Sequence, residues 1–375
     1  MSLTWVLLLA TLLGSCGAVD GASPSQKVVD PAVIEAVQGT VRPEDPLLPL
    51  LVSDVEVAPT VPTAALAVDV GEDAHVPVRV TWRIPGVDSG DREATDVVTL
   101  RREPDGWTRI SPVRLPWGVS DPVAVTSSRC RVVGPPAASA LVAAVHTSCV
   151  RSVPAVLDAW PHWDGAAVIV ITASALDPGT GALVEGAVSD GDPAPADRML
   201  VDGGVVAGLS EVGLDVLMRH ELVHVAMRAT GSAPVPLWFQ EGLAVHVGYS
   251  GVADGRSEQA DELRRLHGLR EAGRWRGSVP DPARFEDPAV RGHAYVAARI
   301  GVEVLMDSVG RDRLVSTVAG DESDGAGRPD PVARPTTDEE RMQWLLRAFG
   351  RSSDWLDREW ARELDRRVGD VRPSP

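Results

Sequence analysis

The sequence lacks several features whose absence excludes whole classes of protein. Asparagine does not occur among the 375 residues, so N-x-[ST] glycosylation is excluded. Acidic residues outnumber basic ones by 53 to 36, and a formal net charge of -17 leaves no broad positive surface for nucleic acid. Beyond an N-terminal run no long apolar stretch is present, which excludes a polytopic membrane protein. Hydrophobic residues, at 44%, suffice for a folded core and for two or three domains.

Cysteine is scarce as well: the chain has only three, Cys16, Cys130 and Cys149. None belongs to a C-x-x-C motif, so a cysteine zinc site is not expected. In an exported protein Cys130 and Cys149 would pair and close a loop of 18 residues, which stabilises the fold by roughly 3 kcal/mol. Two buried free thiols are the alternative.

The N-terminus has the features of an export signal. Residues 3–13 form an apolar run that is too short to span a bilayer but suits a signal h-region, although no Lys or Arg precedes it. The run ends in Leu-Gly-Ser-Cys16, which resembles a bacterial lipobox. We therefore expect a signal peptide over residues 1–16, a flexible linker over 17–49, and a lipid on Cys16 that holds an exported protein at the extracytoplasmic face of the cell membrane. An ordinary cleaved signal with an incidental cysteine is the alternative.

Hydrophobic periodicity predicts an α+β protein. Residues 50–111 should form a small antiparallel β domain, because residues 76–84 and 96–101 alternate between apolar and polar side chains. Residues 112–375 should form a second, mainly helical domain with a short β-sheet. Its expected elements are a helix over 137–160, buried strands over 166–172 and 198–202, helices after 210, and a last amphipathic helix over 353–368.

The sharpest functional signal is the H-E-x-x-H motif formed by His220, Glu221 and His224. Histidines four residues apart lie on one helix face, so both imidazoles can bind one cation. Glu221 is rotated by about 100° from His220, beside the cation, where the general base for a water molecule must stand. The flanking residues are apolar nearly all round, so the helix should be buried and its polar groups need partners, which a zinc ion supplies. A hydrogen-bonded or solvent-facing histidine pair is the alternative.

Zinc in hydrolases takes three protein ligands and leaves a fourth position open. The metzincin extension is excluded, because Met227 and Thr230 stand where it needs Gly and His. Glu241, shortly after Pro236 on a following helix, is the best candidate for the third ligand. His246 is its rival, but it lies about 140° round the helix from Glu241, so both cannot face one metal.

The H-E-x-x-H motif, followed from residue 236 by Pro-Leu-Trp-x-x-Glu-Gly-Leu-Ala, resembles the peptidase MA-like gluzincins found as exported lipoproteins in actinobacteria. The likeness extends from about residue 107 to the C-terminal helix. It implies a zincin-like metallopeptidase domain in which His220, His224 and Glu241 bind Zn²⁺ and Glu221 is the catalytic base. It also implies that the substrate adds as a β-strand along residues 198–202.

The chain departs from that family after the third ligand. Relatives usually carry Asp four residues after the ligand Glu, where it orients an imidazole, whereas this chain has Val245. Loss of such a partner typically costs about 10–100-fold in metal affinity or activity. Asp215, Glu185 and His246 are the candidates to replace it.

A tetrahedral oxyanion also needs a hydrogen-bond donor. The resemblance assigns this role to Tyr295, one of only two tyrosines in the chain. His293, two residues earlier, is the competitor, and packing in the core is the plain alternative for either side chain.

These features predict a lipid-anchored zinc metallopeptidase at the cell surface, which hydrolyses a peptide or protein substrate with a metal-activated water. The alternative is a catalytically inactive, zinc-binding envelope lipoprotein that acts as a binding or scaffold module. The intact Glu221 argues against inactivity, and the missing Asp at position 245 argues for it.

Overall fold

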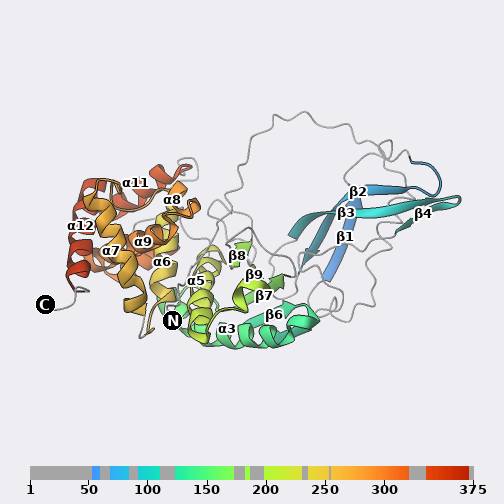
Figure 1. Cartoon of the computed structure of the whole chain (residues 1–375), viewed down its shortest axis with the longest axis horizontal. Helices are drawn as coiled ribbons and strands as arrows, with labels where there is room; N and C mark the ends of the chain where they lie inside the picture. Colours follow the sequence, from blue (N-terminus) through green and yellow to red (C-terminus); the bar gives the residue numbers. More distant parts are fainter. Residues whose placement is uncertain are drawn as a thin grey trace.

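The computed structural model describes residues 53–59, 68–83, 92–109, 123–172, 182–185, 198–229, 235–252, 255–320 and 335–370. The expected signal peptide, the linker and Cys16 lie outside the described residues. Within them the predicted α+β class is confirmed: an antiparallel sheet comes first, and a mainly helical region with a second, mixed sheet follows (Figure 1).

The first sheet is a four-stranded antiparallel meander. Alternation along the strands sets its buried face: in the second strand of the sheet, Ala74, Val76 and Val78 are buried, whereas His75 and Arg79 are exposed. The buried side chains of this sheet are separate from the main core of the helical region. Its strands, in spatial order, are β1 (Ser53–Pro59), β2 (Asp73–Arg83), β3 (Arg92–Glu103) and β4 (Gly106–Arg109).

The second sheet has the spatial order β5-β6-β7-β9-β8. The three central strands are parallel, and the two outer strands run antiparallel to their neighbours. The central strands are buried along almost their whole length and are rich in apolar residues, because both of their faces are covered. The strands are β5 (Val123–Thr126), β6 (Cys130–Gly134), β7 (Ala167–Thr172), β8 (Ala182–Glu185) and β9 (Arg198–Asp202).

The prediction that a substrate adds as a β-strand along residues 198–202 is therefore wrong. These residues form β9, which pairs with β7 on one side and β8 on the other. Its backbone groups are already used, so it cannot accept an added strand. Among the described strands the outer position next to β9 belongs to β8.

Helix α3 (Ser139–Ala159) connects β6 to β7 and packs on the sheet. With the turn before it, Pro136–Ala159 is long and apolar enough to cross a membrane by length and composition alone. In this fold one face of α3 packs against α5 and the sheet, and its Cys149 is fully buried. The predicted disulfide between Cys130 and Cys149 is confirmed, and it ties α3 to β6.

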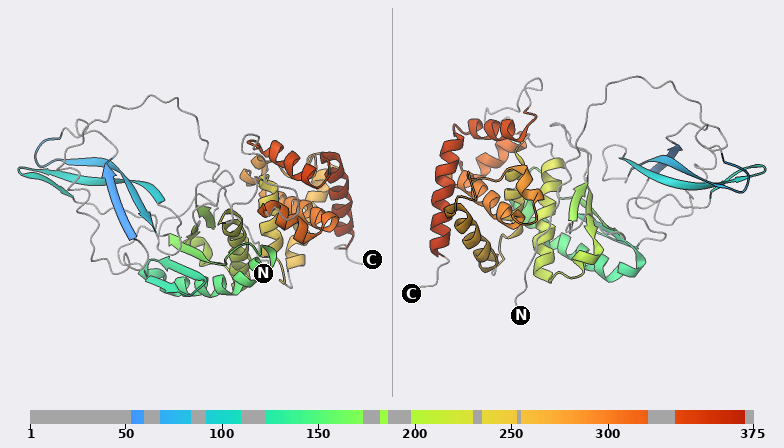
Figure 2. Two further views of the ribbon diagram at one scale, coloured as in Figure 1. Left: turned by 180° about the vertical axis from the view of Figure 1, so that it is seen from behind. Right: turned by 45° about the horizontal axis from the view of Figure 1, so that its top comes forward.

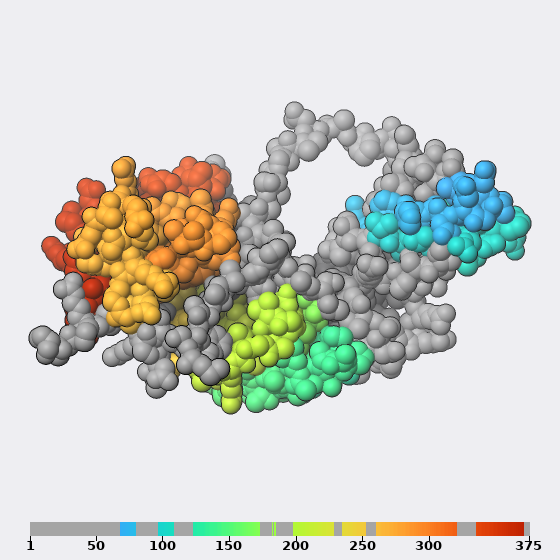
Figure 3. Space-filling model, viewed as in Figure 1, coloured from blue at the N-terminus to red at the C-terminus, as the bar shows by residue number. Residues whose placement is uncertain are grey.

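The helices that follow the second sheet in the sequence pack together, and α12 runs beside α7 and α9 (Figure 2). The space-filling view shows the helices after residue 255 as a continuous orange-to-red mass (Figure 3). The helices are α4 (Gly203–Val206), α5 (Glu211–Ala229), α6 (Leu237–Gly248), α7 (Gly255–Glu271), α8 (Pro282–Glu286), α9 (Arg291–Val309), α10 (Arg311–Ala319), α11 (Asp338–Ala348) and α12 (Ser353–Asp370).

Helices α6 and α9 are in unusually close contact, and two glycines allow it. A Cβ atom at Gly242 would lie 2.4 Å from the carbonyl oxygen of Ala298 and 2.8 Å from Val302. A Cβ atom at Gly301 on α9 would lie 2.6 Å from Val279 and 3.1 Å from the ring of Trp238. Any side chain at Gly242 would thus push the two helix backbones apart.

We expect Gly242→Ala to destabilise the protein by about 1–3 kcal/mol, because the new methyl group meets a backbone carbonyl that cannot move aside. Gly268→Ala is the matched control. Gly268 lies within α7, and a Cβ atom there meets nothing within 4 Å, so this change should stabilise the helix by about 0.5–1 kcal/mol. Urea unfolding of the two variants measures both changes; equal stabilities would show that α6 and α9 are not in this contact.

Candidate metal centre

Helix α5 carries the H-E-x-x-H motif. Polar contacts from the residues before the motif hold this helix against its neighbours. Arg151 of α3 binds Asp215 through Nε, 2.7 Å from Oδ2, and Ser148 donates to Oδ1 of the same carboxylate at 2.6 Å. Arg219 donates to the carbonyl of Ser250, just after α6, at 2.5 Å. Asp215 therefore holds α5 against α3. Its carboxylate is engaged by Arg151 and Ser148, so Asp215 does not orient an imidazole of the motif.

Helix α6 brings Glu241 to the motif. Pro236 is the N-cap of this helix, and the backbone N–H of Leu237 donates to Asp338 Oδ1 of α11 at 2.7 Å. Proline ahead of the first turn supplies a pre-set φ and removes one unsatisfied donor. Almost every residue of α6 is buried, so the Glu241 side chain has no solvent-facing alternative.

Three side-chain atoms converge between the two helices. His220 Nε2 lies 3.2 Å from His224 Nε2 and 3.3 Å from Glu241 Oε2, and His224 Nε2 lies 3.5 Å from the same oxygen. The structure thus brings together the three predicted ligands, which could hold one metal ion. His220 and Glu241 side chains are 1% exposed and His224 is 12% exposed, so the approach to the cluster is on the His224 side.

The carboxylate oxygens of this cluster have no hydrogen-bond donor of their own. Both oxygens of Glu241 and Oε1 of Glu221 are buried without a hydrogen-bond partner, despite the nearness of the two imidazoles to Glu241. Buried acceptors in this state are costly unless a cation or a donor satisfies them. The donor set, the convergence of the atoms and these unsatisfied oxygens all fit a bound metal ion.

Burial and the interactions between the three side chains oppose one another in setting the pKa values of the cluster. Desolvation lowers the pKa of His220. Burial would also lower the pKa of His224, but the neighbouring Glu241 carboxylate outweighs it and the pKa is raised. Burial likewise opposes ionisation of Glu241, yet the two imidazoles prevail and lower its pKa to about 2. Glu241 is therefore anionic at neutral pH, as a metal ligand must be.

Glu221 and Tyr295 lie close to the three ligands. Burial, with a further contribution from Glu241, raises the pKa of Glu221 to about 8. The Tyr295 ring stands edge-on to His220, with centroids 6.0 Å apart, and packs against Phe285 at 5.3 Å. Burial raises the pKa of Tyr295 well above 10, so its hydroxyl keeps its proton.

The two rival histidines lie elsewhere. His246 Nδ1 is 2.7 Å from Glu303 Oε1, on the side of α6 that faces α9, and it is no part of the metal cluster. His293 Nε2 lies 3.5 Å from Glu262 Oε2 of α7. The side chain of Glu185, the remaining candidate to orient an imidazole, lies outside the described part of the structure.

One residue near the site was missed from the sequence. Arg228 Nη1, on α5, donates to the carbonyl of Val184 in β8 at 3.3 Å, which links the motif helix to the outer strand. Arg228 stands four residues after His224, on the same helix face, and this spacing could have revealed it.

Comparison with protein-family models, curated proteins and solved structures finds no match for this chain.

We expect the purified protein to bind one divalent metal ion per chain and His224→Ala to lose it, because two of three ligands cannot hold a metal ion tightly. Metal analysis after gel filtration measures the stoichiometry. His162→Ala is the control, since His162 is exposed and lies outside the cluster, and it should retain bound metal. Equal metal content in His224→Ala and the unaltered protein would refute the ligand assignment.

Proposed function

We propose that the protein is a zinc-dependent metallopeptidase of the gluzincin type, with His220, His224 and Glu241 as the metal ligands. The observation that carries the proposal is the spacing of their donor atoms, 3.2, 3.3 and 3.5 Å. Ligands about 2.0–2.1 Å from one ion at tetrahedral angles stand about 3.3–3.4 Å apart. Two imidazoles among three donors disfavour Mg²⁺ and Ca²⁺, which take oxygen ligands.

The zinc ion would supply a Lewis acid that polarises a carbonyl group and lowers the pKa of a water molecule. Glu221 would accept the proton of the attacking water and return it to the leaving amine nitrogen. A cation beside Glu221 would bring its raised pKa down toward neutral pH, where a base can act. The Tyr295 hydroxyl, which stays protonated, would donate a hydrogen bond to the developing oxyanion.

The substrate would be a peptide that adds to the outer strand β8. Its position supports this, because β8 pairs with β9 on one side and is linked to the motif helix through Arg228. An extended peptide beside β8 would run past the H-E-x-x-H helix, with backbone hydrogen bonds setting its register.

A non-catalytic, zinc-binding envelope protein is the second candidate. It is favoured by Val245, which is buried where relatives carry the imidazole-orienting Asp, and by Asp215, which is held by Arg151. In that case the same three ligands would hold a structural zinc ion, and Glu221 would have no catalytic task.

Two carboxylate variants separate these functions. Glu221→Gln keeps the size of the side chain but cannot accept a proton, so zinc should remain bound and peptide hydrolysis should fall by about 10²-fold or more. Glu241→Gln places a neutral amide among the ligands, so metal affinity should fall first, and excess zinc should restore part of the activity. Zinc titration and a peptide-library assay measure the two effects. Hydrolysis that is unchanged in Glu221→Gln would mean that the zinc is structural and the enzyme proposal is wrong.

We also propose that the protein is exported and held at the cell membrane by a lipid on Cys16. The apolar run and the Leu-Gly-Ser-Cys16 motif support this proposal. Cys16→Ser should move the protein from the membrane fraction to the soluble fraction, as measured by immunoblotting of both. Retention of Cys16→Ser in the membrane fraction would show that something else anchors it.

A further inference from the structure

Glu303 is the centre of a mostly buried ionic cluster that the proposed chemistry does not use. Its Oε1 lies 2.7 Å from His246 Nδ1 of α6 and 2.8 Å from Arg299 Nε of α9. Its Oε2 pairs with Arg367 of α12, whose Nε lies 2.6 Å from Glu363. A carboxylate only accepts, so Nδ1 of His246 is the donor. One carboxylate, 13% exposed, thus joins three helices.

Glu303 keeps its charge in this setting. Burial raises its pKa, but the hydrogen bond from His246 and the charges of Arg299 and Arg367 outweigh burial and hold the pKa below its ordinary value. Its hydrogen bonds are therefore charge-assisted, which makes them shorter and stronger than neutral ones.

The His246 contact lies on the same face of α6 as the close contact with α9. Gly242 and His246 are four residues apart, so both face α9. At Gly242 the helix rests on the carbonyl of Ala298, which limits how near the helices come. The directional hydrogen bond from His246 to Glu303 adds a constraint on how α6 turns about its own axis.

A small rotation of α6 would matter at the metal site. The carboxylate of a helical Glu stands about 6–7 Å from the helix axis, so a turn of about 10° displaces it by about 1 Å. A metal site tolerates deviations of only about 0.2 Å in its ligand distances. Glu241, five residues before His246, would then lose its position beside the two imidazoles.

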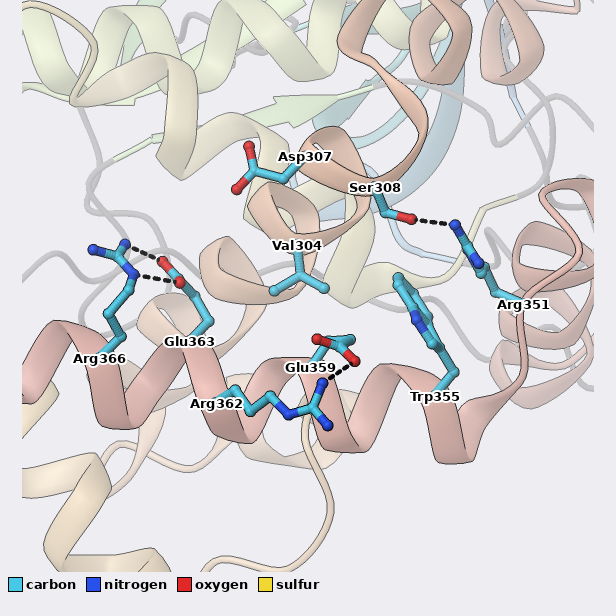
Figure 4. Close-up of a pocket in the computed structure, with 9 residues that line it drawn as sticks. All are labelled: Val304, Asp307, Ser308, Arg351, Trp355, Glu359, Arg362, Glu363 and Arg366. Atoms are coloured by element: carbon cyan, nitrogen blue, oxygen red, sulfur yellow. Dashed lines mark hydrogen bonds and ion pairs between the residues drawn. The ribbon is translucent and has the colours of Figure 1, made fainter.

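Helix α12 extends this constraint to the far side of α9. Between α9 and α12 lies an open groove of about 450 Å³, and three of the arginines that line it pair with neighbouring side chains (Figure 4). These pairs are Arg351 with Ser308, Arg362 with Glu359, and Arg366 with Glu363. In each of the two ion pairs the arginine is exposed, so they contribute little to stability, whereas Arg367 reaches inward to Glu303.

We propose that Glu303 is a positioning residue for the metal ligand Glu241: through His246 it sets the rotation of α6, and through Arg367 it makes metal affinity depend on α12. The proposal rests on the metal site put forward above. In place of an Asp next to an imidazole, this chain would stabilise its metal site by fixing the helix that bears the carboxylate.

A pair of His246 variants in the full chain tests the proposal. Asn keeps an N–H donor near the position of Nδ1, whereas Leu has a similar bulk and no donor. Zinc affinity should fall about 10–100-fold in His246→Leu and change less than about threefold in His246→Asn. The visible spectrum of the Co²⁺-substituted protein should also change in His246→Leu, because it reports ligand geometry. The melting temperature of each metal-free variant shows separately whether the fold is weakened.

Arg367→Met is the second arm and should also weaken zinc binding, although Arg367 has no place in the metal cluster. If His246→Leu does not fold, the zinc affinity of Arg367→Met still tests the proposal. Glu359→Gln is the control, because this carboxylate pairs with Arg362 and is no part of the Glu303 cluster, and the variant should bind zinc as the unaltered protein does. Wild-type zinc affinity and an unchanged Co²⁺ spectrum in both His246→Leu and Arg367→Met would overturn the proposal. Failure of the unaltered protein to bind zinc would instead overturn the proposed function itself.

Discussion

The structure around the centre of the molecule depends on one constraint, the burial of an ionised carboxylate between apolar helices. Glu241 is 1% exposed, and its oxygens face two imidazoles and no hydrogen-bond donor. An isolated charge in such surroundings costs several kcal/mol, which few domains could tolerate without compensation. A cation at the point where the three side chains converge removes that cost. Stability and metal binding are then two descriptions of the same contacts.

The close packing of α6 on α9 follows from the same requirement. The carboxylate must reach α5 from a neighbouring helix, and that helix must be supported from behind without a gap. Gly242, directly after the ligand, lets the backbone of α6 rest on the Ala298 carbonyl. The glycine in the Glu-Gly pair of the motif therefore has a packing role, which explains its place beside the candidate ligand Glu241.

The sequence was most informative where the chemistry is local. His220 and His224 lie on one helix face because of helical geometry alone, and the same geometry correctly separated His246 from Glu241. The strands over 166–172 and 198–202 were predicted as β7 and β9 with bounds within one residue. β5, β6 and β8 were missed because such short runs carry little periodicity, although β9, which is no longer than β6, was found. The edge position assigned to residues 198–202 was wrong for a related reason: strand order depends on pairing between distant segments.

The site also spreads over a long stretch of chain, from α5 to α9, with α12 packed behind α9. A polypeptide is made from its N-terminus, so the two histidines exist well before α9 and α12 do. A growing chain can offer a metal ion only a weak pair of imidazoles, since Glu241 has no supporting helix at that stage. Tight binding of a metal ion would thus require the completed fold. On the proposed function, full metal affinity would appear only after α9 has packed on α6 and α12 on α9.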